Sequence, residues 1–133
     1  EFPKSFYLMN ENFVGGTSSS ADKATSRIIM YPVNVWNDFI AKMEEKLRLG
    51  GKKDVGQQIK VLRSSVEKIE LDPQNRFTLK KELLDLAGIE DKEVYFVGSG
   101  AKIEIWDKVA FDQFTANYQD SIRDTFKELS DDF

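Results

Sequence analysis

The segment RIIMYPVNVWNDF, residues 27–39, carries the pattern on which the fold depends. Its first five residues are rich in β-branched and aromatic side chains, which predicts a strand. Pro32 ends this strand, and Asn34 is a suitable cap for a following helix. Apolar residues then recur at spacings of three and four from Val35 to Leu47, which predicts an amphipathic helix ending at Gly50 and Gly51.

The same pattern returns further along the chain. KIEIWDKVAFDQF, residues 102–114, aligns with the first segment without a gap, at an offset of 75 residues. Tyr31 then falls on Trp106, and Trp36 falls on Phe111. Two strand–helix junctions with aromatic residues in one register indicate a duplicated unit. These aromatic residues, with Phe114, could stack on bases, but their periodic positions favour packing in a core or between subunits.

The remaining sequence predicts further short elements. Residues 2–9 are interpreted as a strand end leading into a helical turn, because Phe2, Phe6 and Met9 recur at helix-like spacing. The small polar residues 17–26 predict an exposed loop. Strands are expected over 12–16, 66–71 and 76–79, and helices over about 54–66 and 80–87. Strands 94–98 and 102–106 are expected to form a hairpin. Asp107 is expected to cap a final helix, which leads into an acidic tail over 120–133.

Composition indicates one folded domain and narrows its chemistry. The chain has 133 residues, of which 41% are hydrophobic and 12% aromatic. It has no cysteine, which excludes disulfides and thiolate chemistry, and no histidine, the commonest general base and metal ligand. An enzyme would have to work with carboxylates, lysine or tyrosine, and no acid pair stands out. The chain is therefore not expected to be an enzyme or to hold a cofactor.

Charge and hydropathy narrow the choice of partners. The net charge of −4 means that nucleic-acid binding would need a local basic surface. Residues 46–68 hold seven basic and two acidic residues, a net +5 that could collect phosphates or could simply be a solvated helix face. No apolar run is long enough to span a bilayer, and no signal-peptide pattern is present. The chain begins at Glu1 without methionine, as a fragment or a processed form would.

The heptapeptide LDPQNRF, residues 71–77, reads as a polar turn between apolar segments. The guanidinium of Arg76 could bond bidentately to guanine or straddle a phosphate. Alternatively, Arg76 pairs with Asp72 across the turn and only fixes its shape. Both roles can hold together, because Asp72 could orient Arg76 for DNA.

Residues 2–118 resemble the MraZ family, bacterial regulators built from two AbrB-like (SpoVT/AbrB) repeats. The strongest piece is DPQNRFTLKKELLDLAGIEDKEVYFVGSGAKIEIWD, residues 72–107, and MYPVNVWNDF resembles the first repeat. The chain departs from the family pattern by Asn75 for glycine, by Lys80 for proline, and by lacking the first acid–arginine motif. The residues that match the family motifs are Asp72, Arg76, Ala87, Gly88, Val97, Gly98, Glu104, Trp106 and Asp107.

The resemblance implies an α+β fold in which two pseudo-symmetric AbrB-like ββαβ-type repeats form a small β-barrel with flanking helices. Residues 1–69 would hold the first repeat, 70–118 the second, and 119–133 an acidic tail. It also implies a cytoplasmic, nucleoid-associated transcriptional regulator, without a membrane partner, that binds promoter DNA repeats as a ring-like homo-oligomer. The expected DNA-binding residues are Asp72, Gln74, Asn75, Arg76, Lys80 and Lys81.

A rival function stays open beside DNA binding. On the same scaffold, the chain could be an oligomeric assembly protein that no longer reads DNA. The acidic balance, Asn75 and the missing first motif motivate this alternative. The acidic tail is expected to be solvated, although its apolar residues Ile122, Phe126 and Leu129 could instead dock on a neighbouring subunit.

Overall fold

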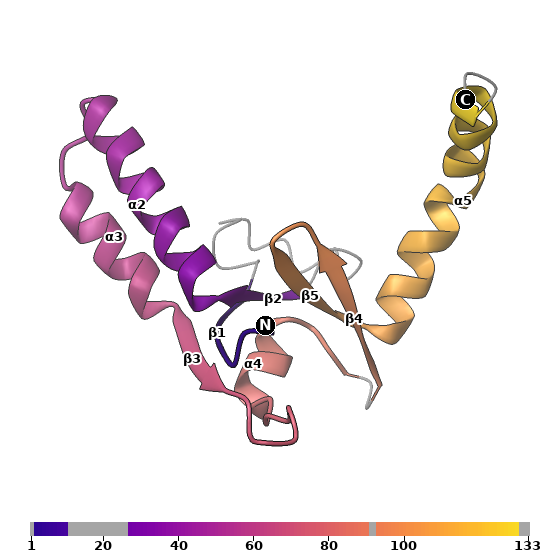
Figure 1. Ribbon diagram of the computed structural model, residues 1–133, viewed down its shortest axis with the longest axis horizontal. Helices are drawn as coiled ribbons and strands as arrows, with labels where there is room; N and C mark the ends of the chain where they lie inside the picture. Colours follow the sequence, from indigo (N-terminus) through magenta and orange to yellow (C-terminus); the bar gives the residue numbers. More distant parts are fainter. Residues whose placement is uncertain (1, 11–26, 91–92, 131–133) are drawn as a thin grey trace.

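A five-stranded antiparallel sheet forms the centre of the molecule in the computed structural model, which describes residues 2–10, 27–90 and 93–130 (Figure 1). The strand order is β3-β1-β2-β5-β4. The α+β class is therefore confirmed. The described strands form an open sheet, so the small β-barrel stays a prediction. The elements are β1 (Ser5–Asn10), β2 (Arg27–Pro32), α2 (Val33–Leu49), α3 (Val55–Ser64), β3 (Val66–Glu70), α4 (Lys81–Leu86), β4 (Val94–Ser99), β5 (Lys102–Asp107) and α5 (Lys108–Ser130).

Both faces of the sheet are covered by apolar side chains. On one face, β1, β2 and β5 pack against the end of α4, in a cluster of Phe6, Leu8, Ile28, Met30, Ala87, Ile89 and Ile105. On the other face, β1 and β2 pack against the α2–α3 hairpin, in a cluster of Met9, Ile29, Tyr31, Trp36, Ile40 and Ile59. We call these the α4 core and the hairpin core. Figure 1 shows the α2–α3 hairpin and α5 extending from the sheet as two arms.

The first strand–helix junction is confirmed, but its predicted cap is wrong. The helix begins at Val33, directly after Pro32, so Asn34 lies inside the first turn, and no side chain caps the helix. Gly50 ends the helix, and Gly51 has a φ of 74°, a conformation that favours glycine. Trp36 is only 1% exposed and anchors the helix to the sheet.

The second junction repeats this arrangement at the predicted offset. Asp107 caps α5, since its Oδ2 accepts a hydrogen bond from the N–H of Ala110 at 3.1 Å. Trp106 is 2% exposed and packs against Phe111, with ring centroids 5.3 Å apart. Burial removes both tryptophans from the candidates for base stacking. The matching junctions are what a duplication would produce, and the duplication stays an inference.

Two predicted elements are wrong, for different physical reasons. Residues 5–10 form a strand rather than a helical turn, because Phe6 and Leu8 face the α4 core while Met9 faces the hairpin core. A strand buried on both faces shows no polar alternation, and helix-like spacing then arises by chance. Residues 76–79 form no strand: Phe77 and Leu79 pack against the α4 core, but the described strand pairings do not include them.

The other helices and strands predicted over described residues are confirmed. They include α3, β3, α4 and the β4–β5 hairpin. Gly88 follows α4 with a φ of 72°, as its predicted place at the helix end requires. The strand expected over 12–16 and the loop over 17–26 lie outside the described residues.

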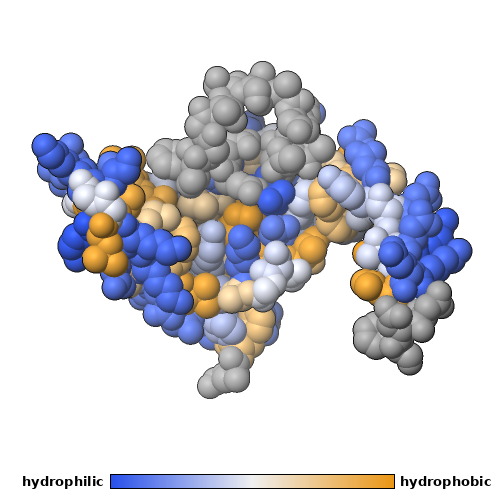
Figure 2. All heavy atoms as spheres, turned by 90° about the horizontal axis from the view of Figure 1, so that it is seen from above, coloured by the Kyte–Doolittle hydropathy of each residue, from blue (hydrophilic) through white to orange (hydrophobic). Residues whose placement is uncertain are grey.

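The acidic tail is helical as far as the structure describes it. Helix α5 continues to Ser130, and from Tyr118 onward it exposes Tyr118, Ile122, Phe126 and Leu129. Figure 2 shows hydrophobic atoms exposed among hydrophilic ones along both helical arms. Among the helices of residues 33–130, none combines the length and the apolar character needed to cross a bilayer.

Candidate nucleic-acid interface

The LDPQNRF turn projects from the end of the edge strand β3, between this strand and α4 (Figure 1). Its apolar ends are fixed: Leu71 and Phe77 pack against the α4 core. The backbone N–H of Leu71 also donates to the carbonyl of Lys4 at 2.8 Å, next to the pairing of β1 with β3. The polar tip is therefore held away from the core, and residues 73–76 are exposed.

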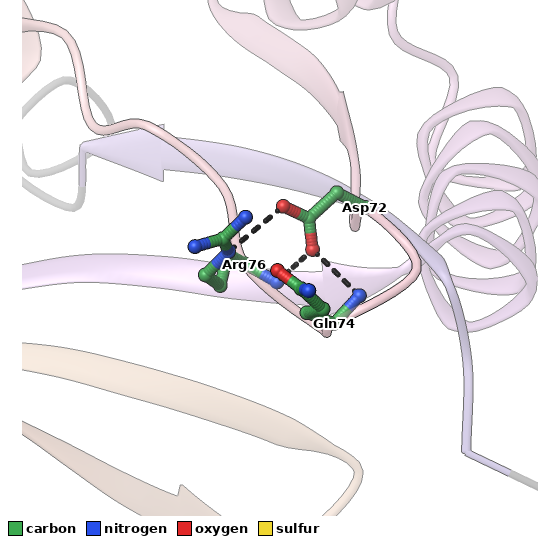
Figure 3. Close-up of polar contacts among 3 residues, drawn as sticks. All are labelled: Asp72, Gln74 and Arg76. Carbon is green, nitrogen blue, oxygen red and sulfur yellow. Dashed lines mark hydrogen bonds and ion pairs between the residues drawn. The ribbon is translucent and has the colours of Figure 1, made fainter.

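The carboxylate of Asp72 organises this tip. Its Oδ1 accepts the backbone N–H of Gln74 at 2.9 Å and that of Arg76 at 2.8 Å. Its Oδ2 accepts Nε of Arg76 at 3.0 Å. Figure 3 shows these three contacts converging on the one side chain. Two backbone bonds close the turn, from the N–H of Asp72 to the carbonyl of Arg76 and from the N–H of Asn75 to the carbonyl of Asp72.

The pair formed by Asp72 and Arg76 agrees with both roles proposed for the arginine. The contact is made through Nε, and the side chain of Arg76 remains 72% exposed. An exposed ion pair contributes little to stability. Its main effect is geometric, because it fixes one edge of the guanidinium and leaves Nη1 and Nη2 outside the pair.

Asn75 occupies the position that needs a left-handed backbone. Its φ is 63°, a left-handed conformation that asparagine tolerates better than most residues other than glycine. Its side chain adds a contact that glycine lacks, since Oδ1 accepts a hydrogen bond from Nζ of Lys4. Lys4 was not among the predicted site residues. It lies 71 residues away from Asn75, and no local pattern marks it.

The two predicted lysines beside the turn have different surroundings. Nζ of Lys80 lies 3.0 Å from Oε1 of Glu67 on β3, and the pKa of Lys80 is raised by this hydrogen bond first and by the charge of Glu67 second. Lys81 begins α4 and is exposed. The turn and both lysines thus belong to one region, with part of the charge of Lys80 already balanced.

The basic segment 46–68 does not gather at the turn. Most of it lies on the α2–α3 hairpin, whose tip at residues 50–51 is on the opposite side of the sheet from the turn (Figure 1). Arg48 is paired with Glu44 at 2.7 Å. Within one chain, the cations at the hairpin tip therefore cannot serve the same phosphates as Arg76.

Residues able to hold a metal do not cluster in the described part of the chain. No group of three or more acidic side chains comes together there in a way that could bind an ion. A hollow beside the turn is lined by Ile69, Glu70, Asp72, Arg76, Phe77 and Thr78. It is a shallow surface next to a guanidinium, which suits a contact with a charged polymer.

We expect the carboxylate of Asp72 to titrate below its ordinary pKa of 3.8. The backbone N–H of Arg76 lowers this pKa most, its side chain and the N–H of Gln74 lower it further, and the charge of Lys4 adds to them, while desolvation opposes the shift. Because the folded pKa is lowered, the contribution of these contacts to stability is present above pH 3.8 and is lost as the pH falls through the lowered value.

Carbon NMR of the carboxyl group over acid pH measures this pKa. In Arg76→Ala the pKa should stay below 3.8, since the backbone N–H groups at positions 74 and 76 are kept. A return to 3.8 in that variant would show that the guanidinium, rather than the backbone, holds the carboxylate.

The family model described as "MraZ protein, putative antitoxin-like" matches residues 64–133. The proteins named "Transcriptional regulator MraZ" include one from Mesomycoplasma hyopneumoniae strain 7448, 45% identical over 64 residues, which are 47% of this chain and 43% of the relative. Another, from Christiangramia forsetii, is 31% identical over 106 residues, 78% of this chain and 66% of the relative.

The residues that the family model matches include the turn and the two lysines that follow it. A third relative of the same name, from Ureaplasma parvum strain ATCC 27815, is 29% identical over 94 residues, 71% of this chain and 63% of the relative. For the first relatives, the matched part spans 54% and 63% of their own length. No solved structure matches the chain. The family model covers more than half of the chain and includes the turn, α4, the β4–β5 hairpin and α5, so the chain belongs to the MraZ family.

Proposed function

We propose that this protein is a transcriptional regulator that binds promoter DNA in a sequence-specific manner through the Asp72–Arg76 turn. The relatives named as transcriptional regulators support a regulatory role. One structural observation carries the DNA-binding part: Asp72 holds Arg76 by Nε, while the side chain of Arg76 stays 72% exposed. The proposal places the protein in the cytoplasm with the nucleoid, where its DNA lies.

The orientation of Arg76 suits a guanine base. A guanidinium reads guanine by donating two parallel hydrogen bonds to O6 and N7. In this turn the Nε edge is already bonded to Asp72, and the Nη groups are available for the two bonds. Because the turn is closed by backbone bonds before DNA arrives, little ordering remains to oppose binding.

The surrounding side chains suit phosphate contacts. Lys81 is exposed at the start of α4, and Lys80 lies beside it with Glu67 as its partner. Gln74 is exposed at the tip and can donate to a phosphate or a base edge. The net charge of −4 disfavours long-range attraction, so binding depends on this local surface.

A single turn offers only a few contacts, and we propose that several act in parallel. A ring-like homo-oligomer would present one such turn from each chain to successive DNA repeats. Linked sites raise the overall affinity by orders of magnitude without new contacts, provided that the spacing matches. The exposed apolar stripe of α5, with Tyr118, Ile122 and Phe126, offers a surface for self-association.

Fluorescence anisotropy on a labelled duplex from the protein's own upstream region tests the function. We expect specific binding that weakens as salt rises from about 50 to 200 mM. Arg76→Ala should lose about 1–3 kcal/mol of binding per engaged turn. Lys53→Ala, an exposed change near the hairpin tip, is the matched control and should bind as the wild type does.

Two results would contradict the proposal. Equal binding by the wild type and Arg76→Ala would remove the role given to this arginine. A stable oligomer without salt-dependent DNA affinity would favour the rival function, an assembly protein on the same scaffold. Sedimentation of the same sample gives the oligomeric state for both cases.

A further inference from the structure

Lys4, which comes before β1, contacts the LDPQNRF turn. It precedes β1, whose Ser5 pairs with Glu70 at the end of β3. Its carbonyl accepts the N–H of Leu71 at 2.8 Å, so its backbone is fixed at the base of the turn. Its Nζ donates to Oδ1 of Asn75. Both ends of the residue are therefore tied to the turn that carries Arg76.

The contact with Asn75 does not balance the positive charge of Lys4, whereas the charges of Arg76 and Lys80 are balanced by carboxylates. Arg76 and Lys80 are each paired with a carboxylate, that of Asp72 and that of Glu67. The side chain of Asn75 is neutral, so its contact orients the ammonium of Lys4 without cancelling the positive charge. Lys4 is exposed, and its charge contributes to lowering the pKa of Asp72, which places it within electrostatic reach of the tip.

We propose that Lys4 is a phosphate-binding cation of this interface, contributed by the segment before β1 and positioned by Asn75. This inference rests on the proposed function. It adds a fixed positive charge beside Arg76 that the acid–arginine motif does not contain. A phosphate contact from Lys4 would position the protein on the DNA backbone, while Arg76 contacts the base edge. The two residues would then have separate roles, one in orientation and one in sequence recognition.

The same contact changes the role of Asn75. An asparagine reads adenine by using its amide oxygen and its amide nitrogen together. Here Oδ1 is occupied by Lys4, so Asn75 cannot read adenine in that way while the contact holds. Asn75 is thus a positioning residue: it supplies the left-handed backbone of the turn, with a φ of 63°, and holds Lys4. Glycine at this position would keep the left-handed backbone conformation but could not accept the hydrogen bond from Lys4.

Three variants test the inference by anisotropy on the upstream duplex and on a scrambled duplex, across a salt series. Lys4→Gln removes the positive charge. Asn75→Gly removes the hydrogen bond to Lys4 and keeps the backbone of the turn. The third variant combines both substitutions. For Lys4→Gln we expect equal weakening on both duplexes and a fall of about 0.9 per engaged turn in the slope of log affinity against log salt. Asn75→Gly should show part of this loss, and the double variant should be no weaker than Lys4→Gln alone.

Two controls separate this inference from the proposed function. Lys53→Gln removes one charge near the hairpin tip and should leave the salt slope unchanged. Thermal unfolding should show the same midpoint for the wild type and Lys4→Gln, because the side chain is exposed. The side-chain amide signal of Asn75 should shift in Lys4→Gln without DNA, which tests the contact by itself.

The results of these experiments distinguish the role of Lys4, the role of Asn75 and the proposed function. If Lys4→Gln binds with the wild-type slope while Arg76→Ala loses binding, the role of Lys4 is overturned and the proposed function stands. If the wild type shows no specific binding, or if Arg76→Ala binds as the wild type does, the proposed function fails and takes this inference with it. If the losses in the double variant add up, Lys4 contacts DNA without help from Asn75, and the positioning role is overturned.

Discussion

Trp36→Ala is expected to lower the free energy of unfolding by about 3–5 kcal/mol. Trp36 is 1% exposed and belongs to the hairpin core. Its ring centroid lies 5.3 Å from that of Tyr31 and 5.8 Å from that of Tyr7, so it joins α2 to both β1 and β2. Removing it leaves a cavity that the rigid sheet cannot close. The loss should therefore include a cavity contribution beyond the lost hydrophobic transfer.

Urea denaturation followed by circular dichroism measures this change, and the fluorescence of Trp106 gives a second probe in the variant. Phe39→Ala is a matched comparison on the same helix, since Phe39 packs on Trp36 but is 37% exposed. Its loss should be clearly smaller. Val61→Ala, on an exposed position of α3, should change stability little. A loss for Trp36→Ala no larger than that for Phe39→Ala would contradict the anchoring role.

Arg76→Lys is expected to abolish most of the preference for the upstream duplex over a scrambled one, while salt-dependent binding persists. Lysine keeps the positive charge but cannot make the planar, two-pronged contact with a base. It also lacks the Nε that Asp72 holds at 3.0 Å, so its ammonium would not be oriented. The ratio of the two affinities should fall by about one to two orders of magnitude, the range of a bidentate base contact.

Competition anisotropy with the two duplexes measures this ratio directly. Lys81→Ala is the complementary control, because removal of a phosphate contact should weaken both duplexes alike and leave their ratio unchanged. If Arg76→Lys discriminates as well as the wild type, Arg76 acts as a charge alone. Specificity would then have to come from the shape of the DNA.

The sequence predicted those parts of the fold whose signals are local. Both strand–helix junctions carry a complete pattern within about 13 residues, and Asp107 caps α5 as expected. The turn residues Asp72 and Arg76 also lie close in sequence, and their contact follows from that spacing. The prediction failed for β1, because a strand buried on both faces loses the alternation that identifies strands.

The missed part of the candidate site depends on long-range geometry. Lys4 meets Asn75 only because β1 pairs with β3, a contact between strands at opposite ends of the first half of the chain. Glu67 reaches Lys80 because the chain folds back after β3, so that Lys80, just before α4, lies beside this strand. Neither pair has a sequence pattern, since the intervening residues carry no information on the register of the sheet.

The pairing of β2 with β5 at the centre of the sheet has a consequence for how the protein is made. Arg27 lies opposite Trp106, and Met30 opposite Ile103, so the middle of the sheet joins residues more than 70 positions apart. Contacts between such distant residues slow folding, because a large loop must close before they form. During synthesis, β2 leaves the ribosome well before its partner exists. The sheet therefore cannot be completed before β5 has been synthesised, and until then the β5-facing edge of β2 has no partner strand.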